Sequence, residues 1–206
     1  MGMQGTLYII AAPSGGGKSS LVKALLESCP NLQVSVSYTT RPARPREQQG
    51  VDYHFVDQTR FDALRDSGVF LEHAEVFGHC YGTSRAWVTE RLQQGIDVLL
   101  EIDWQGKRQI AQSFPEAVSL FILPPSRAVL EQRLRARGQD GDEVIARRMR
   151  AATNEISHWN EFDYLVLNDD FQSAVADMQA IFRARRLQRE PQGARLQRLL
   201  AQLLIQ

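Results

Sequence analysis

The sequence predicts an α/β fold in which helices flank a parallel β-sheet. Three features support this prediction: short, almost unbroken apolar runs, intervening segments whose apolar residues repeat with helical spacing, and a glycine-rich segment where the first run ends. Nearly continuous apolar runs suit strands that are covered on both faces, as in a parallel sheet. Their alternation with helices is typical of a doubly wound domain.

The elements follow in order along the chain. The apolar runs predict four buried strands: Leu7–Ala11, Val98–Ile102, Leu120–Leu123 and Tyr164–Leu167. Apolar residues at helical spacing predict a helix directly after the glycine-rich segment: Leu21, Val22, Leu25 and Leu26. Ser84 and Ser126 are expected to cap two further helices, which would run to Gly95 and Gly138.

Two stretches interrupt this alternation. Residues 34–83 alternate polar and apolar positions and contain proline turn signals, which predicts a small, mostly β insertion. Residues 133–150 contain six arginines, and we interpret the polar segment around them as a lid. The prediction is therefore a single domain with a core at 1–33, 84–125 and 151–206, an inserted module at 34–83 and a lid at 126–150.

The composition limits the classes of function. The chain has 206 residues, and its 24 basic and 24 acidic residues leave a formal net charge of zero. This balance argues against nucleic acid or a membrane surface as a partner. Cys29 and Cys80 lack metal-ligand spacing and are expected to be free thiols. The apolar run near the N-terminus follows no basic stretch and is too short to span a bilayer, so a cytoplasmic location is predicted.

The glycine-rich segment has the pattern of a phosphate-binding loop, or P-loop, between a strand and a helix. Its glycines let backbone N–H groups turn toward phosphate oxygens, and the helix N-terminus adds partial positive charge. Lys18 is expected to reach the β- and γ-phosphates of ATP, and the Ser19 hydroxyl to ligate Mg²⁺. Ala12 departs from the motif, which begins with glycine; the alternative is a turn without a ligand. The predicted ATP-binding residues of the loop are Ala12, Pro13, Ser14, Gly15, Gly16, Gly17, Lys18 and Ser19.

The insertion contains a second candidate anion site. Arg41 and Arg44 lie on a proline-rich, extended segment, and forked guanidinium groups suit bidentate binding of a phosphate. Tyr53 and Tyr81 offer hydroxyl groups, and Glu72 is a carboxylate between apolar residues. Taken alone, the two arginines would more often be solvated surface charges.

Seven motifs, in order over roughly residues 5–185, resemble those of guanylate kinases, and the bacterial enzymes are the most similar. They are the P-loop, Thr39-Thr40-Arg41-Pro42-x-Arg44, Phe70-Leu71-Glu72, Tyr81-Gly82-Thr83, Ile102-Asp103-x-Gln105-Gly106, Arg133-Leu134-x-x-Arg137-Gly138 and Asn168-Asp169-Asp170. The resemblance implies a P-loop kinase core with a five-stranded parallel sheet, a β-rich GMP-binding module at the insertion, and an arginine-rich lid. It also implies transfer of the γ-phosphate of ATP to GMP, with Mg²⁺ as cofactor.

The resemblance also implies roles for single residues. The GMP-binding residues would be Ser37, Arg41, Arg44, Tyr53, Glu72, Tyr81, Thr83 and Asp103. The catalytic residues would be Lys18, Arg41, Arg137 and Arg148, and Asn168 would lie near the adenine of ATP. Glu72 would accept from both guanine N1–H and the 2-amino group; AMP lacks this donor pair and would leave the carboxylate unpaired. The family usually has aspartate at the position of Glu101, which leaves the role of this residue open.

Several alternatives remain open on the sequence. The acceptor phosphate is already ionised, so no general base is expected, but a different phosphorylated acceptor or a non-catalytic protein-binding module would fit the same architecture. dGMP is a further candidate acceptor. A leucine stripe at helical spacing is expected to pack on the core of its own chain, with a contact in a homo-oligomer as the alternative: Leu196, Leu199, Leu200, Leu203 and Leu204.

Overall fold

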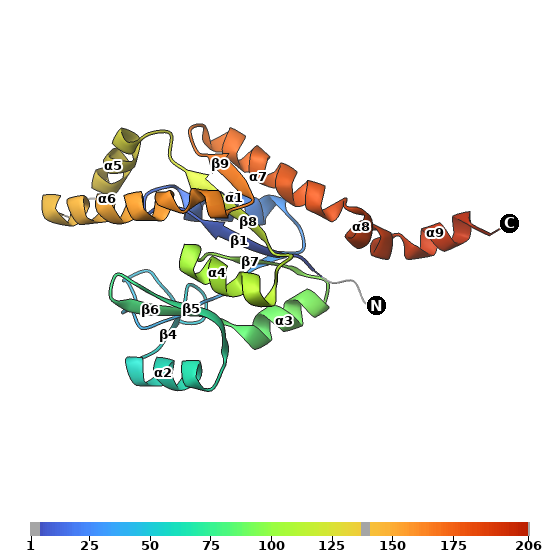
Figure 1. Cartoon of the computed structure of the whole chain (residues 1–206), viewed down its shortest axis with the longest axis horizontal. Helices are drawn as coiled ribbons and strands as arrows, with labels where there is room; N and C mark the ends of the chain where they lie inside the picture. Colours follow the sequence, from blue (N-terminus) through green and yellow to red (C-terminus); the bar gives the residue numbers. More distant parts are fainter. Residues whose placement is uncertain (1–4, 137–140, 206) are drawn as a thin grey trace.

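The computed structural model describes residues 5–136 and 141–205 and contains two sheets (Figure 1). The first sheet has five parallel strands in the order β2-β7-β1-β8-β9, which confirms the predicted five-stranded parallel sheet. Its strands are β1 (Leu7–Ala11), β2 (Leu32–Val34), β7 (Asp97–Leu100), β8 (Val118–Leu123) and β9 (Tyr164–Leu167). The strand predicted over 98–102 ends at Leu100, because the next residues lead into the capped start of a helix.

Helices cover both faces of this sheet, and the central strand β1 is therefore buried on both sides. Tyr8 and Ile10 belong to one core cluster, which α1 (Lys18–Ser28) and α7 (Phe171–Arg186) cover. Ile9 belongs to the other cluster, to which α3 (Arg85–Gln93) and α4 (Trp104–Ser113) contribute. Period-two alternation thus sends successive side chains into two separate cores.

Two predicted helix starts are confirmed by their caps. The Ser84 hydroxyl accepts from the N–H of Trp87 at 3.3 Å, and Ser126 caps α5 (Arg127–Ala136) through the N–H of Val129 at 3.1 Å. α3 ends at Gln93, before the predicted Gly95, which lies beyond the helix end with φ +75°. The predicted end of α5 at Gly138 lies outside the described residues.

The second sheet is formed by residues 38–84 and has the order β4-β3-β6-β5. Its strands are β3 (Tyr38–Thr39), β4 (His54–Phe55), β5 (Phe70–Val76) and β6 (His79–Ser84), and α2 (Gln58–Asp66) packs beside them. The rings of Phe61 on α2 and Phe70 on β5 lie 4.8 Å apart. This β-rich unit lies on one side of the first sheet, whereas α5 and α6 (Asp142–Ser157) lie on the other (Figure 1).

α5 and α6 share a small core of their own, formed by Leu130, Leu134, Ile145, Met149 and Ala152. α6 continues to Ser157, so the lid boundary predicted at 150 falls inside a continuous helix. The short helix η1 (Trp159–Glu161) then leads into β9.

The C-terminal leucine stripe does not pack on its own core, so this prediction is wrong. α8 (Arg189–Arg195) and α9 (Gln197–Leu203) extend away from the rest of the chain (Figure 1). Leu203 and Leu204 are 71% and 79% exposed. Amphipathic spacing predicts an apolar face but not the surface that covers it. Within the ranges that the structure describes, no helix is both long enough and apolar enough to cross a membrane.

Candidate active site

The phosphate loop joins β1 to α1 and leaves the first turn of α1 open toward a cleft. Gly17 is the N-cap residue, has φ +95°, and provides no side-chain cap. The N–H groups of the first helical turn therefore keep their capacity to bind an anion. A Cβ at Gly17 would lie 2.2 Å from Nδ2 of Asn168, so both backbone conformation and space require glycine here.

Lys18 is held near a carboxylate at the end of β7. Its Nζ lies 3.7 Å from Oε2 of Glu101, and both side chains are partly exposed. The glutamate side chain reaches the lysine in this arrangement. The structure therefore places Glu101 where it can orient Lys18 in the cleft.

Two residues from distant parts of the chain support the loop from behind. Nδ2 of Asn168, which is 5% exposed, donates to the Gly16 carbonyl at 2.8 Å. Arg133 on α5 donates through Nη2 to the Asn168 carbonyl at 3.1 Å. The side-chain amide of Asn168 is thus engaged with the loop, and its role near adenine stays a prediction. Arg133 and Asn168 are 35 positions apart in sequence, so no local pattern predicts their contact.

Arg41 and Arg44 are organised around Glu47, a residue that the sequence did not single out. Nη2 of Arg41 lies 2.8 Å from Oε1 of Glu47, and the Arg44 N–H donates to Oε2 at 2.8 Å. The hydrogen bond from Arg41 lowers the pKa of Glu47 below its usual range. The Arg41 guanidinium also lies 5.3 Å from the ring centre of Tyr53. These contacts hold Arg41 in one position, and its role in binding a phosphate stays a prediction.

Glu72 is the most buried ionisable residue of the cleft. It lies on β5, is 3% exposed, and its Oε1 accepts from the Thr83 hydroxyl at 2.5 Å. The pKa of Glu72 is raised to about 7, mainly by burial; the Thr83 hydrogen bond opposes this rise and the negative charge of Asp103 adds to it. β5 and β6 place residues 72 and 83 opposite each other in the sheet, which brings two separate sequence motifs together.

Asp103 is the N-cap residue of α4. Its Oδ1 accepts from the N–H groups of Gln105 and Gly106 at 2.9 and 3.0 Å, and its Oδ2 accepts from Nε2 of Gln105 at 3.0 Å. These bonds satisfy the first turn of the helix and fix the side chain at the rim of the cleft. Gln105, to which the sequence assigned no role, therefore orients Asp103.

Glu155 is a cleft residue that the sequence analysis did not find. It lies on α6, and its Oε2 is buried without a hydrogen-bond partner among the described residues. Burial raises the pKa of Glu155 to about 7; Lys18 and the Ser14 N–H lower it, and Asp103 raises it. A glutamate in an amphipathic helix gives no sequence signal of this contact, because the facing loop is more than 130 residues away.

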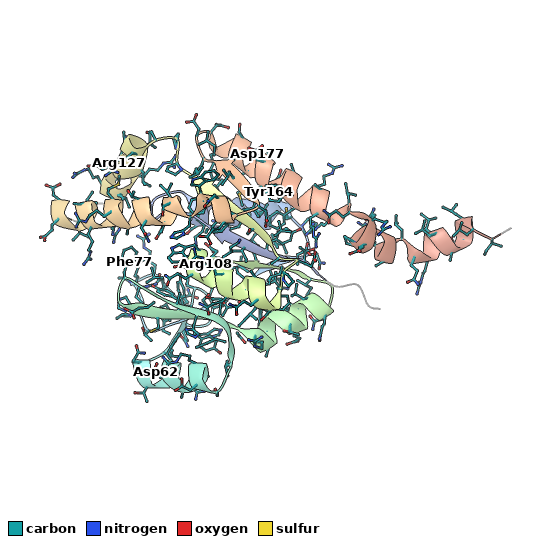
Figure 2. All side chains as sticks on the ribbon, in the orientation of Figure 1. Asp62, Phe77, Arg108, Arg127, Tyr164 and Asp177 are labelled. Atoms are coloured by element: carbon teal, nitrogen blue, oxygen red, sulfur yellow. The ribbon has the colours of Figure 1, made fainter. Side chains whose placement is uncertain are left out.

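One cleft of about 720 Å³ runs between the loop, the second sheet and α6, which is large enough for small-molecule ligands. Most of the sequence-predicted site residues line it: Ala12, Pro13, Ser14, Gly15, Gly17, Lys18, Ser19, Ser37, Arg44, Tyr53, Glu72, Tyr81 and Asp103. Other predicted residues contact residues of this lining: Gly16, Arg41, Thr83 and Asn168. Phe77 also lines the cleft, and Figure 2 shows it at the turn between β5 and β6.

The two lid arginines are only partly described. Arg148 lies on α6, half-buried, two turns before Glu155 and so on the same side of the helix. Arg137 lies outside the described residues. Both catalytic assignments stay predictions.

Fold and cleft together define a class of protein. The P-loop follows the carboxyl end of the central strand β1 and faces a part of the cleft that is built from side chains. This is the arrangement of a P-loop kinase that acts on a small acceptor.

Comparisons with known proteins identify the family. A family model described as guanylate kinase matches residues 4–185. A guanylate kinase of Nitrosococcus oceani is 59% identical over 98% of this chain and 100% of its own length. One of Vibrio vulnificus is 56% identical over 98% of each chain. The crystal structure of guanylate kinase from Anaplasma phagocytophilum is 35% identical, has a TM-score of 0.77, and is matched over 91% of this chain and 89% of its own. The chain belongs to the guanylate kinase family.

Proposed function

We propose that this enzyme transfers the γ-phosphate of ATP to GMP in the cleft described above, with the P-loop holding the donor and the second sheet holding the acceptor. The observation that carries the proposal is the buried Glu72–Thr83 pair, which faces the same cleft as Lys18. A carboxylate in this position can accept together from the two adjacent donors of guanine. Membership in the guanylate kinase family supports the same reaction.

Binding and positioning supply most of the catalysis in this proposal. The acceptor phosphate attacks with an oxygen that is already ionised, so the chain needs no general base. Arg41, preorganised by Glu47, and Arg44 dock this phosphate together with Ser37, Tyr53 and Tyr81. Lys18 moves from Glu101 to the phosphates of ATP, and Arg148 and Arg137 add positive charge from the lid.

Mg²⁺ is the cofactor that we propose. Guanylate kinases are ATP-dependent kinases, and kinases of this kind generally require a divalent metal ion. Among the residues that the structure describes, no group of three or more histidine, cysteine, aspartate or glutamate side chains could hold a metal alone. Mg²⁺ does not need such a group, because it usually takes one or two protein oxygens and completes its coordination with phosphates and water. The Ser19 hydroxyl would be the protein ligand. When bound, the ion would neutralise charge on the β- and γ-phosphates.

The test is a panel of acceptors in one assay of ADP release with ATP and Mg²⁺. GMP should give GDP, and AMP and a ribosyl phosphate should react far more slowly. Absence of GDP from GMP would overturn the proposal, and a faster reaction with the ribosyl phosphate would favour the alternative acceptor.

Other sequence predictions keep the status of proposals. dGMP is a candidate second acceptor, and the exposed leucine face of α9 is a candidate contact in a homo-oligomer. Nucleic acid and membranes are not expected as partners, and the cytoplasm is the proposed location.

A further inference from the structure

α4 contacts the strand that carries Glu72 through a side chain that has no role so far. Gln109 accepts through Oε1 from the His73 N–H at 3.1 Å and donates through Nε2 to the His73 carbonyl at 2.7 Å. β5 is the last strand in its sheet and pairs with β6 on one side only. A side-chain amide has the donor and acceptor of a peptide group, so Gln109 completes the open edge of β5 as another strand would.

The same face of α4 also limits where the Glu72 carboxylate can lie. Gly106 is one helical turn before Gln109, and the two residues are neighbours on the helix surface. A Cβ at residue 106 would lie 2.7 Å from Oε2 of Glu72 and 3.1 Å from Cδ1 of Ile102. These distances are shorter than ordinary non-bonded contacts, so even alanine at this position would displace the carboxylate.

α4 is itself held in place at its start. The cap formed by Asp103 fixes the first turn. Ile110 is fully buried in the core cluster below the first sheet. The helix is therefore a fixed part of the core, and the edge strand β5 of the second sheet lies against it.

We propose that α4 sets the position of the guanine-reading carboxylate, with Gln109 as a positioning residue for acceptor selectivity. Gln109 fixes the backbone next to Glu72, and Gly106 leaves the space in which the carboxylate lies. Hydrogen bonds weaken steeply with poor geometry, and a carboxylate that must accept from two donors at once tolerates less displacement than one that accepts from a single donor. The inference rests on the proposed role of Glu72 in reading guanine.

The test compares GMP with IMP, which keeps N1–H but lacks the 2-amino group. In the Gln109→Leu variant, the ratio of kcat/KM for GMP to kcat/KM for IMP should fall about tenfold, while KM for ATP changes by less than about twofold. Gln109→Glu, which keeps the acceptor but loses the donor, should give a smaller fall in the same ratio. Gly106→Ala should also lower the ratio, because it moves the carboxylate directly.

Gln112→Leu is the matched control, since Gln112 lies on the same helix and is exposed. It should leave the ratio unchanged. A purely structural contact would lower the melting temperature of Gln109→Leu without changing the ratio, and that result would overturn the inference. If Gln109→Leu does not fold, an unchanged ratio in Gln109→Glu overturns it equally.

The Glu72→Ala variant separates failure of this inference from failure of the proposed function. If Glu72→Ala keeps the preference for GMP over IMP, the base-reading role of Glu72 is wrong, and the inference about α4 falls with it. If Glu72→Ala loses the preference but Gln109→Leu keeps it, only the inference about α4 is overturned.

Discussion

The two ends of the cleft are built from different parts of the chain. The donor end consists mainly of backbone: the N–H groups of the loop and of the first turn of α1, with Lys18 as the main side chain. The acceptor end consists of side chains on strands, with Glu72 only 3% exposed and bonded to Thr83. Backbone N–H groups bind any phosphate, whereas a buried carboxylate requires a ligand with matching donors. We infer that turnover and acceptor selectivity depend on opposite ends and can be removed separately.

The largest effect is expected at the donor end. Lys18→Ala should lower kcat by about 10³-fold or more, because the charge that develops on the transferred phosphoryl group loses its nearest cation. The loss should be similar for GMP and dGMP, since the lysine does not contact the acceptor base. Steady-state kinetics measure it, and circular dichroism verifies the fold. A variant that loses activity with one acceptor only would contradict the separation of the two ends.

At the acceptor end, Glu72→Ala should lower the preference for GMP over AMP by about 10²- to 10³-fold and leave KM for ATP nearly unchanged. The physical reason is the loss of the acceptor for guanine N1–H and the 2-amino group. Glu75→Ala is the control, because Glu75 lies on the same strand but is exposed. Full selectivity in the Glu72 variant, or an equal loss in the Glu75 variant, would show that another group reads the base.

Each end also holds a buried carboxyl group, and Glu155 at the donor end should affect stability. Burial raises the pKa of Glu155 in the folded state to about 7, so ionisation opposes folding. The stabilising contribution is present in full below the unfolded pKa and is lost as the pH rises through about 7. Glu155→Gln should therefore raise the free energy of unfolding by about 2 kcal/mol more at pH 8 than at pH 5.

Urea unfolding of the ligand-free protein at both pH values measures this difference. Glu143→Gln is the control, since Glu143 lies on the same helix and is exposed. The same stability change at pH 5 and pH 8 would contradict a raised pKa of Glu155.

The smallest expected effect is the pH dependence of acceptor use. The pKa of Glu72 is raised to about 7 by burial, so the carboxyl is mostly protonated at pH 6 and cannot accept both guanine donors. kcat/KM for GMP should therefore rise about tenfold between pH 6 and pH 8. The phosphate of GMP also titrates near pH 6, at about its usual second pKa. The Glu72→Gln variant should keep the pH dependence that comes from the GMP phosphate and lose the part that comes from the Glu72 carboxyl. Identical pH profiles for the variant and the unchanged protein would contradict the role of Glu72 ionisation.

Much of the fold could be predicted because its signals are local. The strands Leu7–Ala11 and Tyr164–Leu167 have the predicted bounds, since apolar runs bounded by polar residues mark strands. The predicted burial is wrong for Tyr164–Leu167: it is an edge strand, and only Val166 of its four residues is buried. The caps at Ser84 and Ser126 were found because a cap needs only a side chain and an N–H three residues later. The P-loop was found for the same reason. Its conformation is encoded in consecutive residues.

The sequence alone thus determined the fold class, the position of the loop, the family and a list of polar residues that suit two nucleotides. The tertiary structure decided which of these residues meet, and it added partners that no motif marks. Glu47 bonds to Arg41, Glu155 faces Lys18, and Gln109 completes the edge of β5. It also left the leucines of α9 exposed, although their spacing suits a packed helix. The physical reason is that a periodic pattern states what a side chain requires, whereas the chain's path through space decides which distant group supplies it.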